Sequence, residues 1–493
     1  MKTMKKLVAV TVALVMILAM SIPGFAAEDE KFDIVIDGTS GGEYEAYQIF
    51  EGDYYNGKLS NIEWGTGVTD GGKTHFGNAE AKAKTILSES DAKAFAKALV
   101  DGAYLKGAIA PTVSANGKVF TFAELEPGYY LVKDKDGTVT GHESYTSYII
   151  KVVGDVNMKP KSDIPSFNKK VDDVNDSNTT ENAVVWDDSA DYDIGDEIPF
   201  RLEGTVAANY DDYNSYYYVF HDVEEASLTF QEDTVRVFVD GKEITEGFVV
   251  ITNPTDGCTF EVKFADLKQI EEVEASSTIQ VTYTSILNEN AVLGKQGNVN
   301  KAKLEFSNNP NHEGDGKPTG ETDWDNVIVF TYKVVVNKYA EKVAEGNELA
   351  GAEFTLYKKL ADGSKKTIGV TKLNDGKTFE FKGLDDGDYV LEETVAPDGF
   401  NKIKDVKFTV NAEHKIIWEG IPRDSVLVKL EAGDLGTGEV STGQITGNIV
   451  NTSGLTLPGT GGIGTVLFYV AGGLLVAVAA VVLISKKRME ENN

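Results

Sequence analysis

The sequence has almost no cysteine, little histidine and too few basic residues to balance its acids. Cys258 is the single cysteine, so the chain cannot form an internal disulfide bond and has no Cys-x-x-Cys motif for metal binding or redox chemistry. Five histidines lie far apart along 493 residues, which argues against most metal sites and against catalysis by a histidine base. The sequence also lacks a phosphate-binding loop and a dinucleotide fingerprint. We therefore expect no metal and no cofactor.

Acidic residues dominate the charge of the chain. It has 78 Asp and Glu against 47 Lys and Arg, a formal net charge of -31. Nucleic acid is excluded as a partner because phosphate binding needs a basic surface. Such a charge suits a soluble, self-repelling surface protein. The hydrophobic content of 41%, with 10% aromatic residues, indicates folded domains rather than disorder.

The first 26 residues have the pattern of a secretory signal peptide. Three lysines precede an apolar run from Leu7 to Met20, and Gly24-Phe25-Ala26 fits the small-x-small rule for cleavage. The run is too short for a typical membrane helix. The mature chain is therefore expected to begin near Ala27 and to be exported.

The other end of the chain carries a second apolar segment. Residues 463–484 contain no charge, and 22 residues in a helix measure about 33 Å, enough to cross the hydrocarbon core of a membrane. Lys486, Lys487 and Arg488 follow at once and are expected to stay on the cytoplasmic side. Taken alone, this pattern also fits a simple tail-anchored protein.

A short motif directly before this span argues for more than a simple anchor. Leu457-Pro458-Gly459-Thr460-Gly461 resembles the LPXTG sorting signal of Gram-positive surface proteins, which makes residues 455–493 the sorting segment. The resemblance implies that a sortase cysteine attacks the carbonyl of Thr460 and releases the chain from Gly461 onward, and that an amine resolves the acyl-enzyme. It implies sortase and peptidoglycan as partners, and a cell-wall location that follows a transient membrane anchor.

Three segments lie between the two ends, at 27–160, 161–326 and 327–454. The first has strand-like alternation and a helical stretch over Ala79–Val100, with Asn78 as N-cap and Gly102 just beyond its end. The other two are rich in short strands separated by Asp-Gly and Asn-Pro turns. We therefore predict an all-β chain of tandem immunoglobulin-like β-sandwich domains, with a small helical insertion in the first domain.

Longer motifs in these segments resemble known pilin domains. In the third segment, Leu349–Tyr357 and the Tyr389–Phe400 box resemble the two signatures of Cna-B-type domains. In the second, Phe167–Val171 and Leu304–Pro310 resemble the fimbrial isopeptide-forming domain of backbone pilins. The whole set, from signal peptide to sorting signal, resembles a sortase-assembled major pilin of Gram-positive bacteria.

The resemblance implies a self-made cross-link in each of these two domains. A Lys amine attacks the side-chain amide of an Asn, and ammonia leaves. The Lys has to be neutral, so it needs an apolar site that lowers its pKa. A carboxyl group has to stay protonated there, because it polarises the Asn carbonyl.

Side-chain alternation selects candidates for these roles, since residues two apart on a strand share a face. In the third domain it selects Lys338, Glu393 as the acid, and Asn451. In the second domain it selects Lys169, Asp222 as the acid, and Asn308. The neighbouring residues Lys170 and Asn309 remain alternatives in the second domain.

The first domain has a related strand that lacks one member of the set. Pro127–Asp134 resembles the acid-bearing strand, but Lys133 or Asp134 stands where the Glu is expected. We predict no cross-link in this domain.

A stretch between the first two domains resembles the polymerisation motif of backbone pilins. Val156–Lys161 matches it with Lys161 at the position of the nucleophilic amine, while Lys159 replaces an aromatic residue and stays an alternative. Joining Thr460 of one subunit to Lys161 of the next would build an open head-to-tail filament. The protein is then a sortase substrate and not an enzyme, with minor pilins as further partners and a role in adhesion to a ligand that the sequence does not identify. A monomeric, peptidoglycan-anchored adhesin is the alternative.

Overall fold

The computed structural model describes most of the chain between its two ends. The described residues are 30–37, 43–136, 138–139, 145, 147–158, 164–178, 184–310, 316–454 and 463–490. The signal peptide, Lys159, Lys161 and the motif Leu457–Gly461 lie outside them. The described residues form two compact units. Unit 1 holds the described residues within 1–175, 180–331 and 413–428, and unit 2 holds those within 176–179, 332–412 and 429–493. The domain boundaries given above stay predictions.

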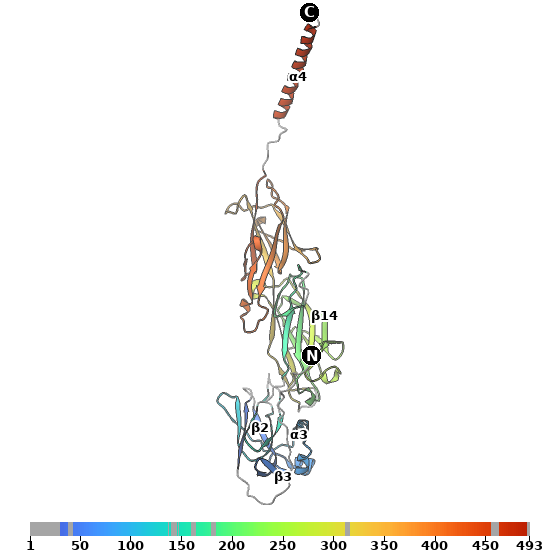
Figure 1. The fold of residues 1–493 in the computed structure, drawn as a ribbon, viewed down its shortest axis with the longest axis vertical. Coiled ribbons are helices and arrows are strands. Elements are labelled where there is room, and N and C mark those ends of the chain that lie inside the picture. Colours follow the sequence, from blue (N-terminus) through green and yellow to red (C-terminus); the bar gives the residue numbers. More distant parts are fainter. Residues whose placement is uncertain are drawn as a thin grey trace, which may run out of the picture. The chain divides into compact units, whose positions relative to one another are not determined.

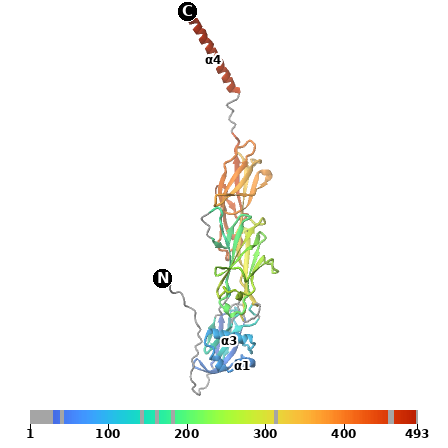
Figure 2. The same cartoon turned by 90° about the vertical axis from the view of Figure 1, so that its right-hand side faces the viewer.

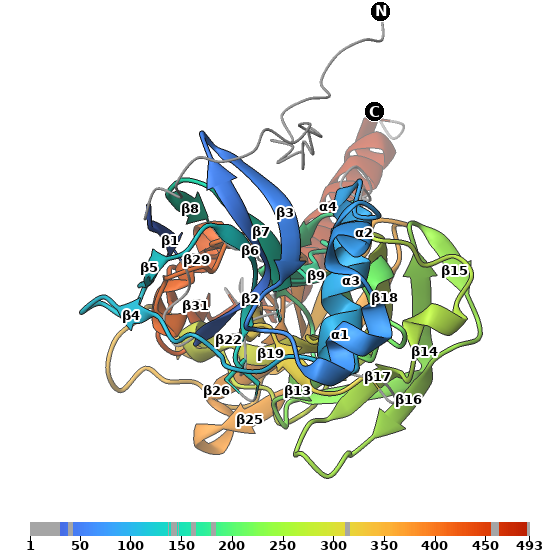
Figure 3. The same cartoon turned by 90° about the horizontal axis from the view of Figure 1, so that it is seen from below.

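The first part of unit 1 has two four-stranded sheets, in the orders β4-β5-β1-β8 and β3-β2-β6-β7. Three helices lie between β3 and β4 in the chain and run beside β2 and β3 (Figure 3). The elements are β1 Phe32–Asp37, β2 Tyr44–Tyr55, β3 Lys58–Trp64, α1 Asp70–Phe76, α2 Ala79–Ala83, α3 Glu89–Asp101, β4 Thr112–Val113, β5 Val119–Leu125, β6 Gly128–Asp134, β7 Ser147–Val152 and β8 Val156–Met158.

Strand alternation builds two apolar layers from one sheet. Ala46 and Val132 face the other sheet, where they pack with Ile34, Ile36 and Phe122. Side chains on the opposite face of the same strands, such as Ile49 and Leu131, pack instead against Phe95 and Leu99 of α3. The helical insertion therefore covers one face of the sheet β3-β2-β6-β7, and Figure 2 shows α1 and α3 in the blue part of the chain to which these strands belong.

The single helix predicted over Ala79–Val100 is two helices in the structure. Asn78 does cap α2, since its side chain accepts from Ala81 N, but α2 ends at Ala83. Ser88 then starts α3 with a capping box, in which its hydroxyl accepts from Asp91 N and the Asp91 carboxylate accepts from Ser88 N. This box makes a new helix start favourable in the middle of the predicted one. Gly102 ends α3 as expected.

The second part of unit 1 is a β-sandwich. One sheet has the order β10-β9-β12-β18-β14-β15, and the other has the order β11-β21-β19-β13-β17-β16, with β20 paired to β19. The elements are β9 Phe167–Asp172, β10 Trp186–Asp187, β11 Ser189–Asp191, β12 Glu197–Thr205, η1 Tyr210–Asp212, β13 Tyr218–Glu224, β14 Leu228–Val239, β15 Lys242–Ile244, β16 Val249–Thr252, β17 Phe260–Phe264, η2 Leu267–Gln269, β18 Thr278–Leu287, η3 Gly294–Gln296, β19 Asn298–Ser307, β20 Thr319–Glu321 and β21 Asp325–Phe330.

Unit 2 contains a second sandwich, of two five-stranded sheets in the orders β25-β26-β22-β31-β30 and β24-β23-β27-β28-β29. Its first and last long strands, β22 and β31, are parallel neighbours. The elements are β22 Tyr332–Ala340, β23 Glu353–Lys359, β24 Lys365–Ile368, β25 Thr371–Leu373, η4 Asn374–Gly376, β26 Thr378–Leu384, β27 Gly387–Val395, β28 Val406–His414, β29 Leu427–Glu431, η6 Gly433–Leu435, β30 Gly438–Glu439 and β31 Gln444–Asn451. Between β28 and β29 the chain forms η5 Arg423–Ser425, which belongs to unit 1.

A single long helix, α4, follows the sandwich of unit 2 and spans Ile463–Glu490 (Figure 1). Within it, Tyr469–Arg488 is long and apolar enough to cross a membrane. Apart from the helices of the first domain, α4 and the short 3-10 helices η1 to η6, the regular elements of the described chain are strands, so the predicted all-β class is confirmed.

Candidate functional site

In unit 2, three of the residues predicted for a cross-link meet in the core of the sandwich. Lys338 lies on β22 and Asn451 at the end of β31, where the register pairs Lys338 with Ile449. Glu393 reaches them from β27 in the facing sheet. All three side chains are fully buried.

The contacts in this cluster already bring amine, amide and acid together. The Lys338 Nζ contacts the Asn451 Oδ1, and lies 3.6 Å from the Glu393 Oε1. The Asn451 amide donates to both carboxylate oxygens of Glu393, at 3.0 and 3.1 Å. Burial lowers the pKa of Lys338, against the opposing effect of Glu393. A neutral amine facing an amide carbonyl is the arrangement that nucleophilic attack needs.

In unit 1, Lys169 lies in a second buried cluster. Its Nζ is 2.5 Å from the Asp222 Oδ2 and 2.6 Å from the Tyr283 hydroxyl, which itself donates to the same carboxylate oxygen at 2.8 Å. Lys169, Asp222 and Tyr283 are at most 2% exposed. Lys170, the alternative to Lys169, points elsewhere and pairs with Asp188 at the edge of the core.

Burial favours the neutral forms of this pair. It lowers the pKa of Lys169 and raises the pKa of Asp222, and in each case this effect exceeds the mutual attraction of the two groups. A second acid, Glu224, lies on the same strand, and burial together with the charge of Asp222 raises its pKa to about 8. The site therefore favours a nucleophilic amine beside protonated carboxyl groups.

The structure does not bring Asn308 to this cluster, so that assignment is corrected. In the pairing of β13 with β19, Asp222 lies opposite Ala302 and Tyr218 opposite Phe306. Asn308 is six residues beyond Ala302, a separation of about 20 Å along the strand. Its carbonyl accepts from Tyr145 N of the first domain, at the far end of the sandwich. Asn309 is farther still.

Asn300 takes the place that the sequence gave to Asn308. It is fully buried and lies opposite Glu224, two residues from Ala302 on the same face of β19. Its amide donates to the Tyr283 hydroxyl at 2.9 Å and contacts the Glu224 Oε1 at 3.3 Å. Asn300 and Lys169 are thus both hydrogen-bonded to the same hydroxyl. Its alternation with Ala302 and Leu304 was visible in the sequence, but Asn308 has the same parity.

The first domain also buries a lysine, Lys133, on β6. Its Nζ contacts carboxylates of Glu45 at 2.7 Å and Asp136 at 2.9 Å, and donates to the main-chain carbonyl of Asp134. These contacts make Lys133 an ion-paired lysine, and among the residues that the structure describes none of them is to a side-chain amide. That this domain forms no cross-link stays a prediction.

Comparison with known proteins identifies two parts of the chain. Residues 333–420 match the SpaA family, a prealbumin-like fold domain, and residues 449–492 match the LPXTG cell wall anchor motif. The chain carries a SpaA-type domain and a cell wall anchor. Lys338 and Glu393 lie in the SpaA-type domain, and Asn451 lies at the start of the anchor match. The anchor and the apolar helix α4 make this a wall-anchored surface protein.

One curated relative matches about half of the chain. The trypsin-resistant surface T6 protein of Streptococcus pyogenes serotype M6 is 30% identical over 261 residues, and the match covers 49% of this chain and 44% of that relative. The chain thus matches less than half the length of that relative. The solved T6 backbone pilin of the same serotype, with its modular three-domain structure, has a TM-score of 0.55 at 18% identity and covers 87% of this chain and 99% of its own.

A second solved structure, the full-length major pilin SpaD from Corynebacterium diphtheriae, has a TM-score of 0.49 at 18% identity and covers 86% of this chain and 98% of its own. The T6 structure is described as a backbone pilin and the SpaD structure as a major pilin. At this level of identity, the likeness to the T6 structure shows the fold.

Proposed function

We propose that this protein is the shaft subunit of a covalent cell-surface pilus, with two self-made isopeptide bonds that stiffen it. Among the described residues three lysines are fully buried. Lys358 contacts the carboxylates of Asp176 and Asp385, whereas Lys169 and Lys338 each lie in a cluster with a carboxyl group and an asparagine. These two clusters, in a chain with a cell wall anchor, are the observation that carries the proposal. An ordinary protein rarely buries a lysine completely. The homology to T6 and the backbone-pilin description of its solved structure support the same function.

The bond in unit 2 would join Lys338 to Asn451. The neutral Lys338 Nζ attacks the side-chain amide carbon of Asn451 and forms a new C–N bond. Glu393 transfers a proton from Nζ to the amide nitrogen, and this nitrogen leaves as ammonia. Because β22 and β31 are neighbours in one sheet, this bond fastens the first long strand of the domain to the last.

The bond in unit 1 would join Lys169 to Asn300, with Asp222 as the acid and Tyr283 holding both partners. Lys169 comes from one sheet of the sandwich and Asn300 from the other, so this bond ties the two sheets together. Each bond closes a loop of more than 100 residues. By analogy with the loop entropy of disulfides, each stabilises its domain by on the order of 5 kcal/mol.

The positions of the bonds explain what they would do for a filament. A pulling force that enters at Tyr332 and leaves after Asn451 would pass through the Lys338 cross-link, and residues 339–450 would carry no load. A filament that is held at the wall has to resist such forces. An amide bond also cannot be reduced, which suits a chain with a single cysteine.

Polymerisation would join Thr460 of one subunit to Lys161 of the next. Lys161 or its neighbour Lys159 supplies the amine, and the sortase, minor pilins and peptidoglycan are the partners. The second candidate function is a monomeric, wall-anchored adhesin with the same two cross-links. The similarity to the T6 surface protein does not favour this adhesin over the pilin.

Intact mass tests the two cross-links directly. For the expressed chain Ala27–Thr460 we expect a mass below the sequence mass by two ammonias, because each bond expels one. Peptide mapping should then find Lys169 joined to Asn300 and Lys338 joined to Asn451. A mass equal to the sequence mass would show two ordinary sandwiches and would remove the basis of the proposal.

A control variant at the neighbouring residue Glu392 separates the proton-transfer role of Glu393 from a loss of folding. In the chain carrying Glu393→Gln, the Lys338–Asn451 bond should form 10²- to 10⁴-fold more slowly, the range typical of a lost acid–base group. The mass deficit of freshly made protein should fall to one ammonia. Glu392→Gln is the matched control, because Glu392 lies on the other face of β27 and pairs with Lys402. An unchanged deficit in Glu393→Gln would assign the proton transfer to another group.

A further inference from the structure

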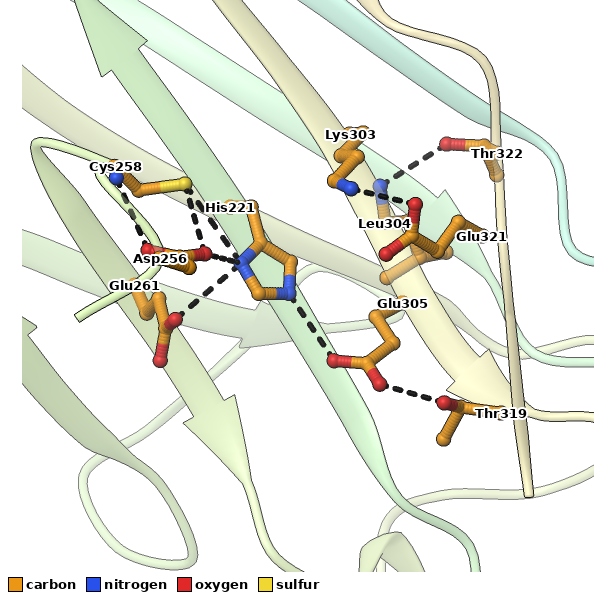
Figure 4. A network of polar contacts seen from close by, with 10 residues as sticks. All are labelled: His221, Asp256, Cys258, Glu261, Lys303, Leu304, Glu305, Thr319, Glu321 and Thr322. Atoms are coloured by element: carbon orange, nitrogen blue, oxygen red, sulfur yellow. Dashed lines mark hydrogen bonds and ion pairs between the residues drawn. The ribbon is translucent and has the colours of Figure 1, made fainter. Parts of the chain in front are cut away.

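In the β-sandwich of unit 1, the outer face of the sheet that contains β13 and β17 holds a cluster of side chains with different metal-binding groups. His221 on β13 lies opposite Glu261 on β17, and the turn before β17 brings Asp256 and Cys258 to the same side of the imidazole ring (Figure 4). One nitrogen, one sulfur and two carboxylates meet there. His221 and Cys258 are buried, whereas the side chain of Asp256 is 40% exposed and leaves the cluster open to solvent.

Three acceptors face a single ring nitrogen in this cluster. The His221 Nδ1 lies 3.0 Å from the Asp256 Oδ2, 3.3 Å from the Glu261 Oε1 and 3.9 Å from the Cys258 Sγ. The Cys258 Sγ is 3.1 Å from the same Asp256 oxygen. An imidazolium has only one proton at Nδ1 and can satisfy only one of these groups well. A metal ion would be bound by all of them.

The distances between the ligand atoms fit a tetrahedral ion. Bonds of about 2.0–2.1 Å to nitrogen and oxygen and 2.3 Å to sulfur place the ligand atoms of a tetrahedral zinc site roughly 3.3–3.6 Å apart. The three distances among the ligand atoms of His221, Asp256 and Cys258 are 3.0, 3.1 and 3.9 Å, and Glu261 lies 3.3 Å from the His221 Nδ1. Shifts of about half an ångström would therefore close these three ligands around an ion, with Glu261 approaching as the fourth from the His221 side.

The other ring nitrogen has the partner that a metal-binding histidine usually has. The His221 Nε2 donates to the Glu305 Oε2 at 3.2 Å, and Glu305 is itself fixed by the Thr319 hydroxyl at 2.6 Å. Figure 4 shows Glu305 on the side of the ring away from Asp256 and Cys258. A carboxylate that accepts from Nε2 keeps the proton there and turns the Nδ1 lone pair toward the other ligands.

We infer that His221, Asp256, Cys258 and Glu261 form a binding site for a divalent transition metal of the zinc type. The thiol and imidazole favour such an ion over Ca²⁺ and Mg²⁺, which prefer shells of oxygen alone. On binding, the Cys258 S–H bond breaks, its proton passes to solvent and a metal–sulfur bond forms, without a change of oxidation state. The ion would tie the turn before β17 to β13 and add a non-covalent clamp to the domain.

Cobalt gives the sharpest test, because Cys258 is the only cysteine in the chain. The purified full chain in detergent is stripped with a chelator and titrated with Co²⁺. We expect a thiolate-to-cobalt charge-transfer band together with visible bands of tetrahedral intensity, and both should disappear when Zn²⁺ is added in equal amount. The charge-transfer band can come only from Cys258, so this result does not depend on a variant that folds.

Variants then assign the ligands. Cys258→Ser should remove the charge-transfer band, and Glu305→Gln should weaken Zn²⁺ binding roughly 10- to 100-fold without removing the band. His75→Ala is the matched control, since His75 lies on α1 and stacks on Tyr104. The inference is overturned if the wild-type chain shows no charge-transfer band with Co²⁺, or if Zn²⁺ fails to displace Co²⁺. Either result would leave His221 hydrogen-bonded among carboxylates without an ion.

Discussion

Replacing Asn300 with alanine is expected to remove one of the two ammonia losses and to lower the melting temperature of the middle domain sharply. The loss of a cross-link worth on the order of 5 kcal/mol corresponds to roughly 10–20 °C for a domain of this size. Intact mass reports the covalent bond, and calorimetry of the same sample reports the stability. The mass is the decisive reading, because Asn300→Ala also removes a hydrogen bond to Tyr283.

Asn308→Ala is the matched control for this experiment. Asn308 is also a buried asparagine and follows directly after the last residue of β19, but it lies about 20 Å from Asp222 along the strand direction. The Asn308→Ala chain should keep the full mass deficit. A deficit lost in Asn308→Ala and kept in Asn300→Ala would restore the assignment made from alternation alone and would contradict the register of β13 and β19.

The second large effect is expected in the native host, where Lys161→Ala should abolish the covalent polymer. Protein released from the wall should change from a ladder of high-mass species to a single band, because Thr460 of one subunit no longer finds an amine on the next. Immunoblots of wall digests measure this directly. Lys159→Ala is the control, and its ladder should persist.

The outcomes of this experiment separate the proposed functions. A ladder that disappears only in Lys159→Ala would move the polymerising amine by two residues. A single band in the wild type would establish the monomeric adhesin. Neither result bears on the zinc site or on the cross-links, which are measured on purified protein.

Within the resemblance to Cna-B-type domains, alternation was enough to choose the third-domain residues, because only the face of each strand had to be decided. The structure buries Lys338, Glu393 and Asn451 in one place, and their cross-linking role stays a prediction. The same rule could not choose among the asparagines of β19 and the residue that follows it. Asn298, Asn300 and Asn308 share one parity, and parity gives the face of a strand but not the distance along it.

The helical insertion shows a similar limit. Apolar periodicity predicted a continuous helix to Val100, but the side chain of Ser88 and that of Asp91 start a separate helix within it. A capping box can be recognised in a sequence, but an uninterrupted helix is an equally good local solution. Packing of α3 against the sheet below it favours the broken form.

The sequence by itself determined the cellular location of the protein, its all-β fold class and the residue types that its cross-linking chemistry needs. Those features depend on runs, short motifs and alternation, which are properties of neighbouring residues. Only the tertiary structure decided that Asn300 is the asparagine beside Lys169, because strand register is set by pairing between residues 80 positions apart. It also brought Cys258 to His221, although the counts of both residues argued against a metal site, because side chains far apart in the chain become neighbours only when the sheet forms.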